Sequence, residues 1–594
     1  MTKEAEAVNR ANDVQLRMRP GIIAASLIVI GLPIGILLNL TVPNVAGIGM
    51  LTALISALAI VVWWLFFSRA RRAERWGAFA VLIVGWLAMR PFLDRSIIGG
   101  AMGALPILTL PVLAVALVVW ATVTQNRSIG LRRVSLVVAI LIACGLCTLV
   151  KTEGIRGGFF EFHWRWTPTF EERLLASGND DAVSKVPAAA RANTEPVTAS
   201  PVPPAPGPPA DWPGFRGADR DDIVHNVRIE TDWSKSPPVE LWRQPIGPGW
   251  SSFAVDGDLF YTLEQRGNDE IVASYRLSTG KPVWRHRDAV RFYESNGGAG
   301  PRGTPTVVEG RVYTFGATGI LNVLNGSTGA VIWSRNVSAD SGMKVPMWGF
   351  SSSPLVINDI VVVAAGGKLA AYDIVTGKPR WFGPDGGFSY SSPHLITIDD
   401  VPQIVLLGGG AMSFAPSNGA VLWRHEWSVG AIVQPANLAD GNILISGVAP
   451  TGMGGEGIRR LAIAQKSGKW TVNERWTSTG LKPYFNDFVV HNGHAFGFDG
   501  SILSCIDLAD GSRKWKGGRY GGGQLLLLAD QDLLLVLSDE GELALVSATP
   551  GEFKELARFK AIEGKTWNHP VVVHDILLVR NGEEMAAFRL TALK

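Results

Sequence analysis

Charge and cysteine are both scarce in this chain of 594 residues. Charged residues make up 18% of the sequence, whereas soluble proteins average about 25%. The net charge of +3 is too small to indicate nucleic acid as a partner. Three cysteines, of which Cys144 and Cys147 lie in an apolar stretch, cannot form a disulfide framework. These shortages exclude a nucleic-acid-binding protein and a disulfide-stapled scaffold.

The missing charge is confined to one part of the chain. Residues 21–150 hold 11 charged residues among 130, while the other 464 residues hold 96 and resemble a soluble protein. A helix needs about 20 apolar residues to cross a bilayer. The sequence therefore predicts an α-helical membrane bundle of five spans, and a lipid bilayer as a partner. The predicted spans are 21–41, 45–67, 76–93, 98–123 and 134–150.

Positive charge alternates along the loops between these spans. Arginine and lysine precede the first span and fill the second and fourth loops, and the first loop has none. Since cytoplasmic loops retain these residues, the pattern predicts a cytoplasmic tail at 1–20 and export of everything after Val150. No small-residue cleavage site follows a short apolar core, so the first span is expected to stay as an anchor. We therefore expect a multi-pass cytoplasmic (inner) membrane protein with a periplasmic C-terminal part.

Two connecting segments follow the predicted spans. In the juxtamembrane segment 151–182, Thr169-Phe-Glu-Glu172 is typical of a capping box and predicts a short helix. Residues 183–210 contain eight prolines in 28 residues and predict an extended linker without a core.

A repeat of about 44 residues fills the chain from Ser251 to Leu590. Each unit opens with a small residue and a proline before an apolar strand, and ends with a Thr-Gly or similar turn and a tryptophan. Successive tryptophans lie 39 to 53 residues apart, which suits one four-stranded propeller blade and not a helical repeat. We therefore predict an all-β eight-bladed propeller with four-stranded antiparallel blades over 211–594. Its last blade is completed by Val239–Gln244, and the repeated tryptophans pack between blades.

The repeat endings carry a resemblance to a known family. Asp373-Ile-Val-Thr-Gly-Lys-Pro-Arg-Trp381 resembles the pyrroloquinoline quinone (PQQ) repeat, and the opening Asp211–Asp221 is similar to that of bacterial PQQ-binding-like propeller proteins. The resemblance implies either of two functions. Some members are quinoprotein dehydrogenases that hold PQQ and calcium, and membrane-bound glucose dehydrogenase has a comparable five-span N-terminal region. Others, such as the propeller lipoprotein of the outer-membrane β-barrel assembly machinery, bind proteins without a cofactor.

Two departures from the dehydrogenases favour the second function. The adjacent cysteine pair of many alcohol-oxidising members is absent, and 44 residues for each blade leave little room for the insertions that build a cofactor chamber. We therefore expect a binding or assembly platform for a periplasmic protein or peptide. The alternative is a PQQ-dependent dehydrogenase that oxidises an alcohol or sugar and passes electrons to membrane quinone.

The resemblance also implies where a cofactor would bind, in the joins between blades, of which 287–303 and 336–351 are the longest. A PQQ site needs an aromatic face, cations for the carboxylates, oxygen ligands for calcium and a carboxylate base. A structural alternative is that Arg302 and Glu294 pair with each other or with backbone while the tryptophans pack between blades. The candidates are Trp348 and Trp567 for stacking, Arg302 and Lys344 for the carboxylates, Glu294, Asn296 and Asn486 for calcium, and Asp487 as the base.

Overall fold

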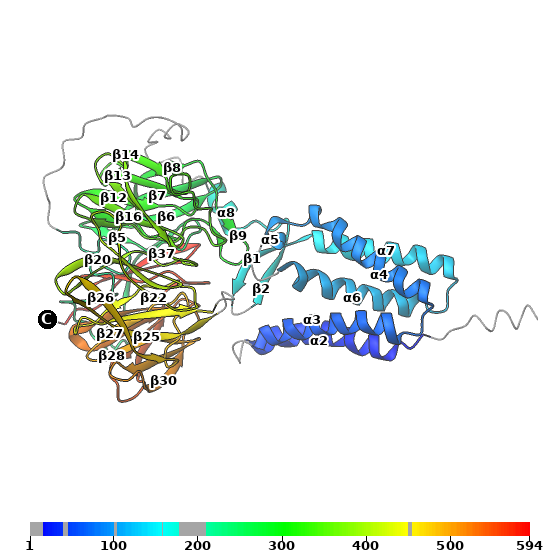
Figure 1. Cartoon of the computed structure of the whole chain (residues 1–594). Helices are drawn as coiled ribbons and strands as arrows, with labels where there is room; N and C mark the ends of the chain where they lie inside the picture. The colour runs from blue at the N-terminus through cyan, green and yellow to red at the C-terminus, as the bar shows by residue number, and fades with distance from the viewer. Residues whose placement is uncertain are drawn as a thin grey trace, which may run out of the picture. The chain divides into compact units, whose positions relative to one another are not determined.

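The chain forms two compact units (Figure 1). A computed structural model describes residues 16–39, 45–99, 104–156, 159–177, 209–449 and 454–593. The first unit runs to Thr169 and also includes Tyr293–Gly298; the second contains Phe170–Phe292 and Ala299 onward. We refer to them as the helical unit and the propeller unit.

Among its described residues the helical unit contains helices at all five predicted positions, and three of these helices are long and apolar enough to cross a membrane. Those three are Ile48–Phe67, Ala104–Thr124 and Ile129–Thr148. Helix α4 carries three charged residues among its 18, which shortens its apolar part. The prediction of five spans is therefore supported for three. The helices are α2 (Arg19–Asn39), α3 (Val45–Val62) with its π-helical end η1 (Trp63–Phe67), α4 (Arg72–Met89), η2 (Arg90–Phe92), α5 (Arg95–Ile98), α6 (Ala104–Thr124) and α7 (Ile129–Thr148).

A small hairpin of β1 (Val150–Arg156) and β2 (Phe159–Trp164), which was not predicted from the sequence, follows α7. The predicted short helix is present as α8 (Phe170–Ala176) in the propeller unit. Within the helical unit, Ser295 N–H donates to the Gly99 carbonyl at 3.2 Å. The segment Tyr293–Gly298, with β9 (Tyr293–Glu294) and the start of β10 (Gly298–Ala299), thus packs as part of that unit.

The propeller unit has eight antiparallel sheets of four strands each, one of which gains β3 (Ile223–Val224) as a fifth, parallel strand. The eight-bladed architecture predicted from the repeat is confirmed. Blade 1 consists of β5 (Ala254–Asp256), β6 (Leu259–Arg266), β7 (Asp269–Arg276) and β8 (Pro282–Asp288), and blade 2 of β11 (Thr306–Val308), β12 (Arg311–Phe315), β13 (Ile320–Asn325) and β14 (Val331–Asn336). Blade 3 consists of β15 (Leu355–Ile357), β16 (Ile360–Ala365), β17 (Lys368–Asp373) and β18 (Pro379–Asp385), and blade 4 of β19 (His394–Ile398), β20 (Val401–Gly408), β21 (Gly410–Phe414) and β22 (Val421–Glu426). Blade 5 consists of β23 (Ala436–Asn437), β24 (Ile443–Val448), β25 (Gly455–Lys466) and β26 (Lys469–Ser478), and blade 6 of β27 (Val489–His491), β28 (His494–Asp499), β29 (Ile502–Asp507) and β30 (Arg513–Arg519). Blade 7 consists of β31 (Gln524–Leu528), β32 (Leu533–Leu537), β33 (Glu542–Ser547) and β34 (Glu555–Lys560), and blade 8 of β35 (Val571–Val573), β36 (Ile576–Arg580), β37 (Glu584–Arg589) and β4 (Val239–Pro245). Short helices α9 (Val337–Ser341) and η3 (Ala529–Gln531) lie between strands.

The ring of blades closes as predicted. Strand β4, which precedes blade 1 in the sequence, is the outer strand of blade 8 and pairs with β37 from Glu584↔Pro245 to Arg589↔Val239. The two ends of the repeat array therefore hold each other, and blade 8 has no missing strand that another chain could supply.

A tryptophan and a glycine join most neighbouring blades. Trp333 of blade 2 donates from Nε1 to the Ile374 carbonyl of blade 3 at 3.0 Å. Its ring covers Gly377, which has a φ of +66° and whose Cβ, if present, would lie 2.7 Å from the ring. The same arrangement joins Trp242 to Gly280, Trp284 to Gly329, Trp381 to Gly419 and Trp476 to Gly511. The predicted packing role of these tryptophans is confirmed.

Blades 4 and 5 are joined differently. Trp423 donates to Gln403 of its own blade at 2.6 Å and not to the next blade. The β25–β26 hairpin is longer than its neighbours, and its Ile463, Trp470 and Val472 pack with Trp423 in one apolar cluster. Apolar contact thus takes the place of the tryptophan–glycine joint.

We expect Gly377→Ala to lower the free energy of unfolding by about 2–4 kcal/mol, because it adds a left-handed alanine and a clash with Trp333. Gly500 is a matched control, with the same φ of +66° but nothing within 4 Å of its Cβ position. Gly500→Ala should cost about 1 kcal/mol, from backbone strain alone. Thermal unfolding of the two variants measures the difference, and equal losses would contradict the tryptophan–glycine joint.

Candidate functional site

A ring of hydrogen bonds passes from blade to blade around the channel, at the positions where the inner strands begin. In most steps the backbone N–H of one blade donates to a side-chain oxygen of the next blade. The steps are Ser252 to Thr304 (2.9 Å), Thr304 to Ser353 (3.0 Å), Ser353 to Ser392 (2.9 Å), Ser392 to Gln434 (3.1 Å), Gln434 to Asp487 (3.2 Å) and Asp487 to Gln524 (3.3 Å).

Blade 8 completes the ring. Gln524 Nε2 donates to the Trp567 carbonyl at 3.2 Å, and Ser252 Oγ donates to the His569 carbonyl at 2.7 Å. Asp487 and His569 are the ionisable members of a ring that is otherwise made of neutral polar residues. We call this ring the collar; it consists of Ser252, Thr304, Ser353, Ser392, Gln434, Asp487, Gln524 and His569.

The chain's own residues 211–226, which we call the plug, reach the collar from within the channel. Trp212 pairs with Val255 of the inner strand of blade 1, and β3 pairs with the inner strand of blade 7. Arg216 Nη2 donates to the Phe488 carbonyl of blade 6 at 2.8 Å. Arg220 donates to the Pro393 carbonyl of blade 4 at 2.9 Å and to the Pro354 carbonyl of blade 3. The plug thus connects blades on different sides of the channel.

A buried ionic cluster forms where the plug meets the collar. Arg216 Nε lies 2.5 Å from Asp222 Oδ2, and Arg216 Nη1 lies 3.2 Å from Asp487 Oδ1. The ring nitrogens of His569 lie 3.5 Å from Asp222 and 3.6 Å from Asp487. Arg216, Asp222 and Asp487 are each at most 2% exposed, so these charges depend on one another.

Burial acts on both carboxyl groups with different net results. Burial alone would raise the pKa of Asp222, but the adjacent Arg216 and His569 outweigh it and hold that pKa below its usual range. At Asp487, burial outweighs the attraction of Arg216 and His569, and the pKa lies above its usual range. Asp222 is therefore the firm anion of the cluster and Asp487 the carboxylate that is easier to protonate.

The same cluster has the donor set of a small cation site. Asp222, Asp487 and His569 each offer one ligand atom, and these atoms lie within 4.8 Å of one another. The guanidinium of Arg216 lies against both carboxylates. The guanidinium of Arg216 therefore already occupies the position of a cation beside these two carboxylates.

The structure places the predicted cofactor-binding residues in separate surroundings. Arg302 Nε donates to the Trp348 carbonyl at 3.1 Å, so these two candidates do meet, through the backbone. Lys344 is exposed. The ring of Trp567 has the Lys565 ammonium 3.8 Å from its centroid and the Trp250 ring 4.8 Å away.

The predicted calcium ligands and base also bind neighbouring protein groups. Glu294 accepts from the N–H groups of Asn296 and Gly297 at 3.0 and 2.8 Å, within the helical unit. Asn486 Oδ1 accepts from Tyr484 N–H at 3.1 Å. Asp487 belongs to the collar and pairs with Arg216. A PQQ site needs a free base and an open pocket, whereas Asp487 is paired with Arg216 and the channel holds the plug.

The plug residues Arg216, Arg220 and Asp222 were not predicted as site residues. The stretch Asp211–Asp221 was noted only as part of a resemblance. The small residue and proline that open each repeat did mark the collar positions, because Thr304, Ser353, Ser392 and Gln434 each precede a proline.

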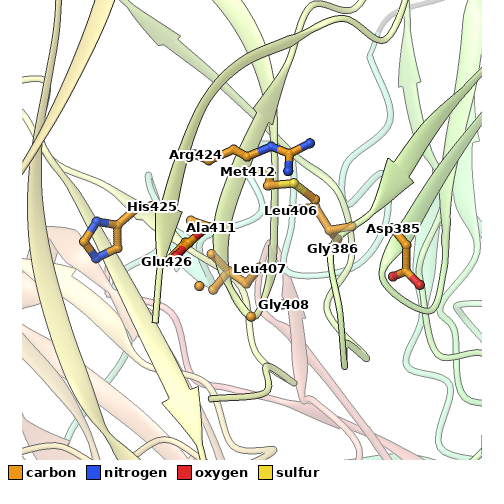
Figure 2. Close-up of a pocket in the computed structure, with 12 residues that line it drawn as sticks. Asp385, Gly386, Leu406, Leu407, Gly408, Ala411, Met412, Arg424, His425 and Glu426 are labelled. Carbon is orange, nitrogen blue, oxygen red and sulfur yellow. The ribbon is translucent and has the colours of Figure 1, made fainter. Parts of the chain in front are cut away.

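Two cavities differ in size and lining. One, of about 140 Å³, lies among Gly386, Gly408–Gly410, Met412 and Arg424 of blades 3 and 4 (Figure 2). It is smaller than the roughly 300–1,000 Å³ of small-molecule sites, and Gly409 N–H is already bonded to the Gly386 carbonyl. The other, of about 1070 Å³, lies in the helical unit and is lined mainly by apolar residues of α6 and α7. A hydrocarbon chain of a lipid or of a membrane quinone would suit its lining.

Apolar side chains are exposed at two neighbouring joins. Met347 is 59% exposed and Val345 41% in the join before blade 3, and Phe388 is 50% exposed in the join before blade 4. The two joins are in contact, since Trp348 N–H donates to the Tyr390 hydroxyl at 3.2 Å. Within the second join, the Phe388 ring lies 5.2 Å from the Tyr390 ring. Apolar groups gathered on a surface in this way often mark protein contacts.

Two buried glutamates of blade 1 have opposite electrostatic surroundings. Burial and the facing Asp288 raise the pKa of Glu270 to about 8. Burial also acts on Glu264, but Arg266 and Arg285 outweigh it and hold its pKa at about 2. Glu270 is therefore neutral at pH 7 and Glu264 is charged.

Glu270 should make stability depend on pH. Its raised pKa contributes stability in full below its ordinary pKa near 4.5, and this is lost as the pH rises through about 8. In the native chain the free energy of unfolding should therefore fall by on the order of a few kcal/mol between about pH 5 and pH 9. We expect this fall to disappear in Glu270→Gln, as measured by denaturant unfolding. Glu264→Gln should instead destabilise at every pH in this window, by about 3–5 kcal/mol, because it removes the buried negative charge that attracts Arg266 and Arg285. An unchanged pH dependence in Glu270→Gln would contradict this assignment.

The collar can be tested at Ser353, whose hydroxyl accepts the N–H of Thr304. Ser353→Ala should cost about 1–3 kcal/mol, because it leaves that buried N–H without its partner. The control Ser428→Ala, at an exposed join residue, should be neutral. Thermal unfolding measures both, and a neutral Ser353→Ala would mean that the ring is not a source of stability.

Comparisons with known proteins agree with a PQQ-repeat propeller. The model of a family described as outer membrane protein assembly factor BamB matches residues 239–392. The outer membrane protein assembly factor BamB of Yersinia pestis is 22% identical over 338 residues, which are 54% of this chain and 72% of that protein. Among solved structures, BamB from Moraxella catarrhalis has 14% identity and a TM-score of 0.43, and covers 59% of this chain and 98% of its own. A quinohemoprotein alcohol dehydrogenase from Pseudomonas putida has 13% identity and a TM-score of 0.47, and covers 64% and 80%. The second unit is therefore an eight-bladed propeller similar in part of its sequence to BamB-like PQQ-repeat proteins.

Proposed function

We propose that this protein is a propeller anchored in the cytoplasmic membrane that acts as a platform for binding another polypeptide in the periplasm. The observation that carries the proposal is the plug: the channel in which a PQQ enzyme would hold its cofactor contains residues of this chain, bonded to blades 3, 4 and 6. A propeller with a filled channel can bind a partner only at its surface or by moving the plug.

Three further features support a protein partner. The joins before blades 3 and 4 expose Val345, Met347 and Phe388. A family model described as outer membrane protein assembly factor BamB matches residues 239–392 of the propeller unit. Three apolar helices provide the anchor, and the distribution of arginine and lysine in the sequence favours a periplasmic propeller.

A PQQ-dependent dehydrogenase is the competing function. It would need Asp487 free to take a proton from the substrate, whereas Asp487 is 2% exposed and paired with Arg216. The large apolar cavity of the helical unit would suit a quinone, but a lipid chain suits it equally. We therefore favour the platform.

The two functions predict different results for the purified full chain. A platform should bind no PQQ in the presence of calcium and should reduce no dye with alcohols or sugars. Stoichiometric PQQ binding with substrate-dependent dye reduction would overturn the platform and establish the dehydrogenase.

The binding face can be located by site-specific photo-crosslinking in native membranes. Met347 lies in a join, at the start of blade 3, whereas Val375 is similarly exposed (56%) in the turn beside Asp359, at the opposite end of the blade. We expect a crosslinker at Met347 to give a discrete polypeptide adduct at least fivefold more abundant than one at Val375. Equal labelling at both positions would contradict a join-side platform.

A further inference from the structure

The collar presents hydrogen-bond acceptors to the channel. Its backbone N–H groups are used in the blade-to-blade ring, so the carbonyls beside them and the Asp487 carboxylate remain to bind whatever lies in the channel. The carbonyls of Ser353, Pro354, Pro393 and Phe488 all accept from arginines of the plug. A guanidinium, with five donors and no acceptor, is the side chain that suits such surroundings.

The structure assigns to the collar a role as a binding site for an arginine-bearing polypeptide loop, which the plug occupies in cis and which a partner segment can engage by displacing the plug. This inference rests on the proposed function in that the partner is a polypeptide. It adds the chemistry of the partner and the device that regulates its access.

The collar distinguishes one arginine by position. Asp487 and His569, its two ionisable members, come from blades 6 and 8, and both lie next to the Arg216–Asp222 pair. Phe215 of the plug also packs edge-on against the His569 ring, 4.9 Å away. An otherwise uniform ring of serine, threonine and glutamine thus has one acidic side at which a loop is held in a single orientation.

The plug can leave the channel without unthreading. At its start, Asp211 accepts from Gly257 N–H, in the turn after the inner strand of blade 1. At its end, Asn226 N–H donates to Asp530, in the turn after the inner strand of blade 7. Both ends therefore lie at the same side of the propeller, and only Ile223 and Val224 pair with a blade as a strand.

The inserted plug also holds strained backbone and an incompletely balanced charge. Arg216, Arg220, Asp222 and Asn226 all have φ between 56° and 65°, a left-handed conformation that costs free energy in residues other than glycine. Arg220 is 7% exposed and binds carbonyls, and burial lowers its pKa to about 9. These costs favour withdrawal once a competing loop offers its own arginine.

The test uses the full chain in detergent and a fluorescent peptide of residues 211–223. In a variant with Arg216→Ala and Arg220→Ala the plug should be weakened, and the peptide should bind it in a 1:1 ratio at least tenfold more tightly than it binds the native chain, by fluorescence polarisation. The native chain competes because its own plug is present at a high effective concentration. A peptide with both arginines replaced by alanine, or addition of Asp487→Asn to the variant, should abolish binding.

Hydrogen exchange measured by mass spectrometry supplies the control. Amides of 212–226 should exchange at least tenfold faster in the Arg216→Ala, Arg220→Ala variant, while those of β12 stay unchanged. Arg475→Ala, at an exposed arginine of blade 5 outside the plug, should change neither readout. A plug that stays protected in the variant, or peptide binding that does not need the arginines, would overturn the inference. Neither result depends on a natural partner, so the platform proposal could survive such a failure.

Discussion

The constraint on which the propeller depends is that every blade must satisfy its backbone where it turns into the channel. At that point the N–H groups precede the sheet ladder and have no strand beside them. The neighbouring blade supplies the missing partner. The side chain at the start of one blade accepts the N–H of the blade before it, from Ser252 around to Gln524. Blade 8 closes the ring through its carbonyls. Because each blade completes its neighbour, the collar and the β4–β37 closure favour the full ring over any part of it.

This use of the N–H groups decides the chemistry of the channel. Because the backbone N–H groups of the collar donate to neighbouring blades, the groups that face the channel are hydrogen-bond acceptors. A segment that carries arginines is therefore a suitable occupant of the channel. Arg216 and Arg220 bind carbonyls of blades that lie far apart in the sequence, and Arg216 also neutralises Asp222 and Asp487. The same contacts pair Asp487, the residue predicted from the sequence as a base if the chain is a dehydrogenase. The channel of this propeller is shaped around its own chain.

Away from the channel, blades are held by a second joint of a different kind. A tryptophan of one blade covers a left-handed glycine of the next, so that the Thr-Gly turn and the tryptophan of the repeat serve one interface. The departure at Trp423 shows what the joint supplies, because there the long β25–β26 hairpin provides apolar contact in its place. Val345, Met347 and Phe388 in the joins are exposed and belong to neither the collar nor the tryptophan–glycine joints.

The sequence by itself determined the local pattern and its count. Period-two alternation, turns and one tryptophan for each repeat predicted eight blades and the closing strand Val239–Gln244, and apolar runs located the helices, because burial of one face leaves a periodic trace. The tertiary structure alone decided which distant residues come into contact. Arg216 donates to the carbonyl of Phe488, which lies 272 residues away in the sequence. Asp487 belongs to the collar and pairs with Arg216. Glu294 and Asn296, by contrast, pack in the helical unit. No local sequence pattern predicts these long-range contacts, because they depend on the order of the blades around the closed ring and on the position of the plug within it.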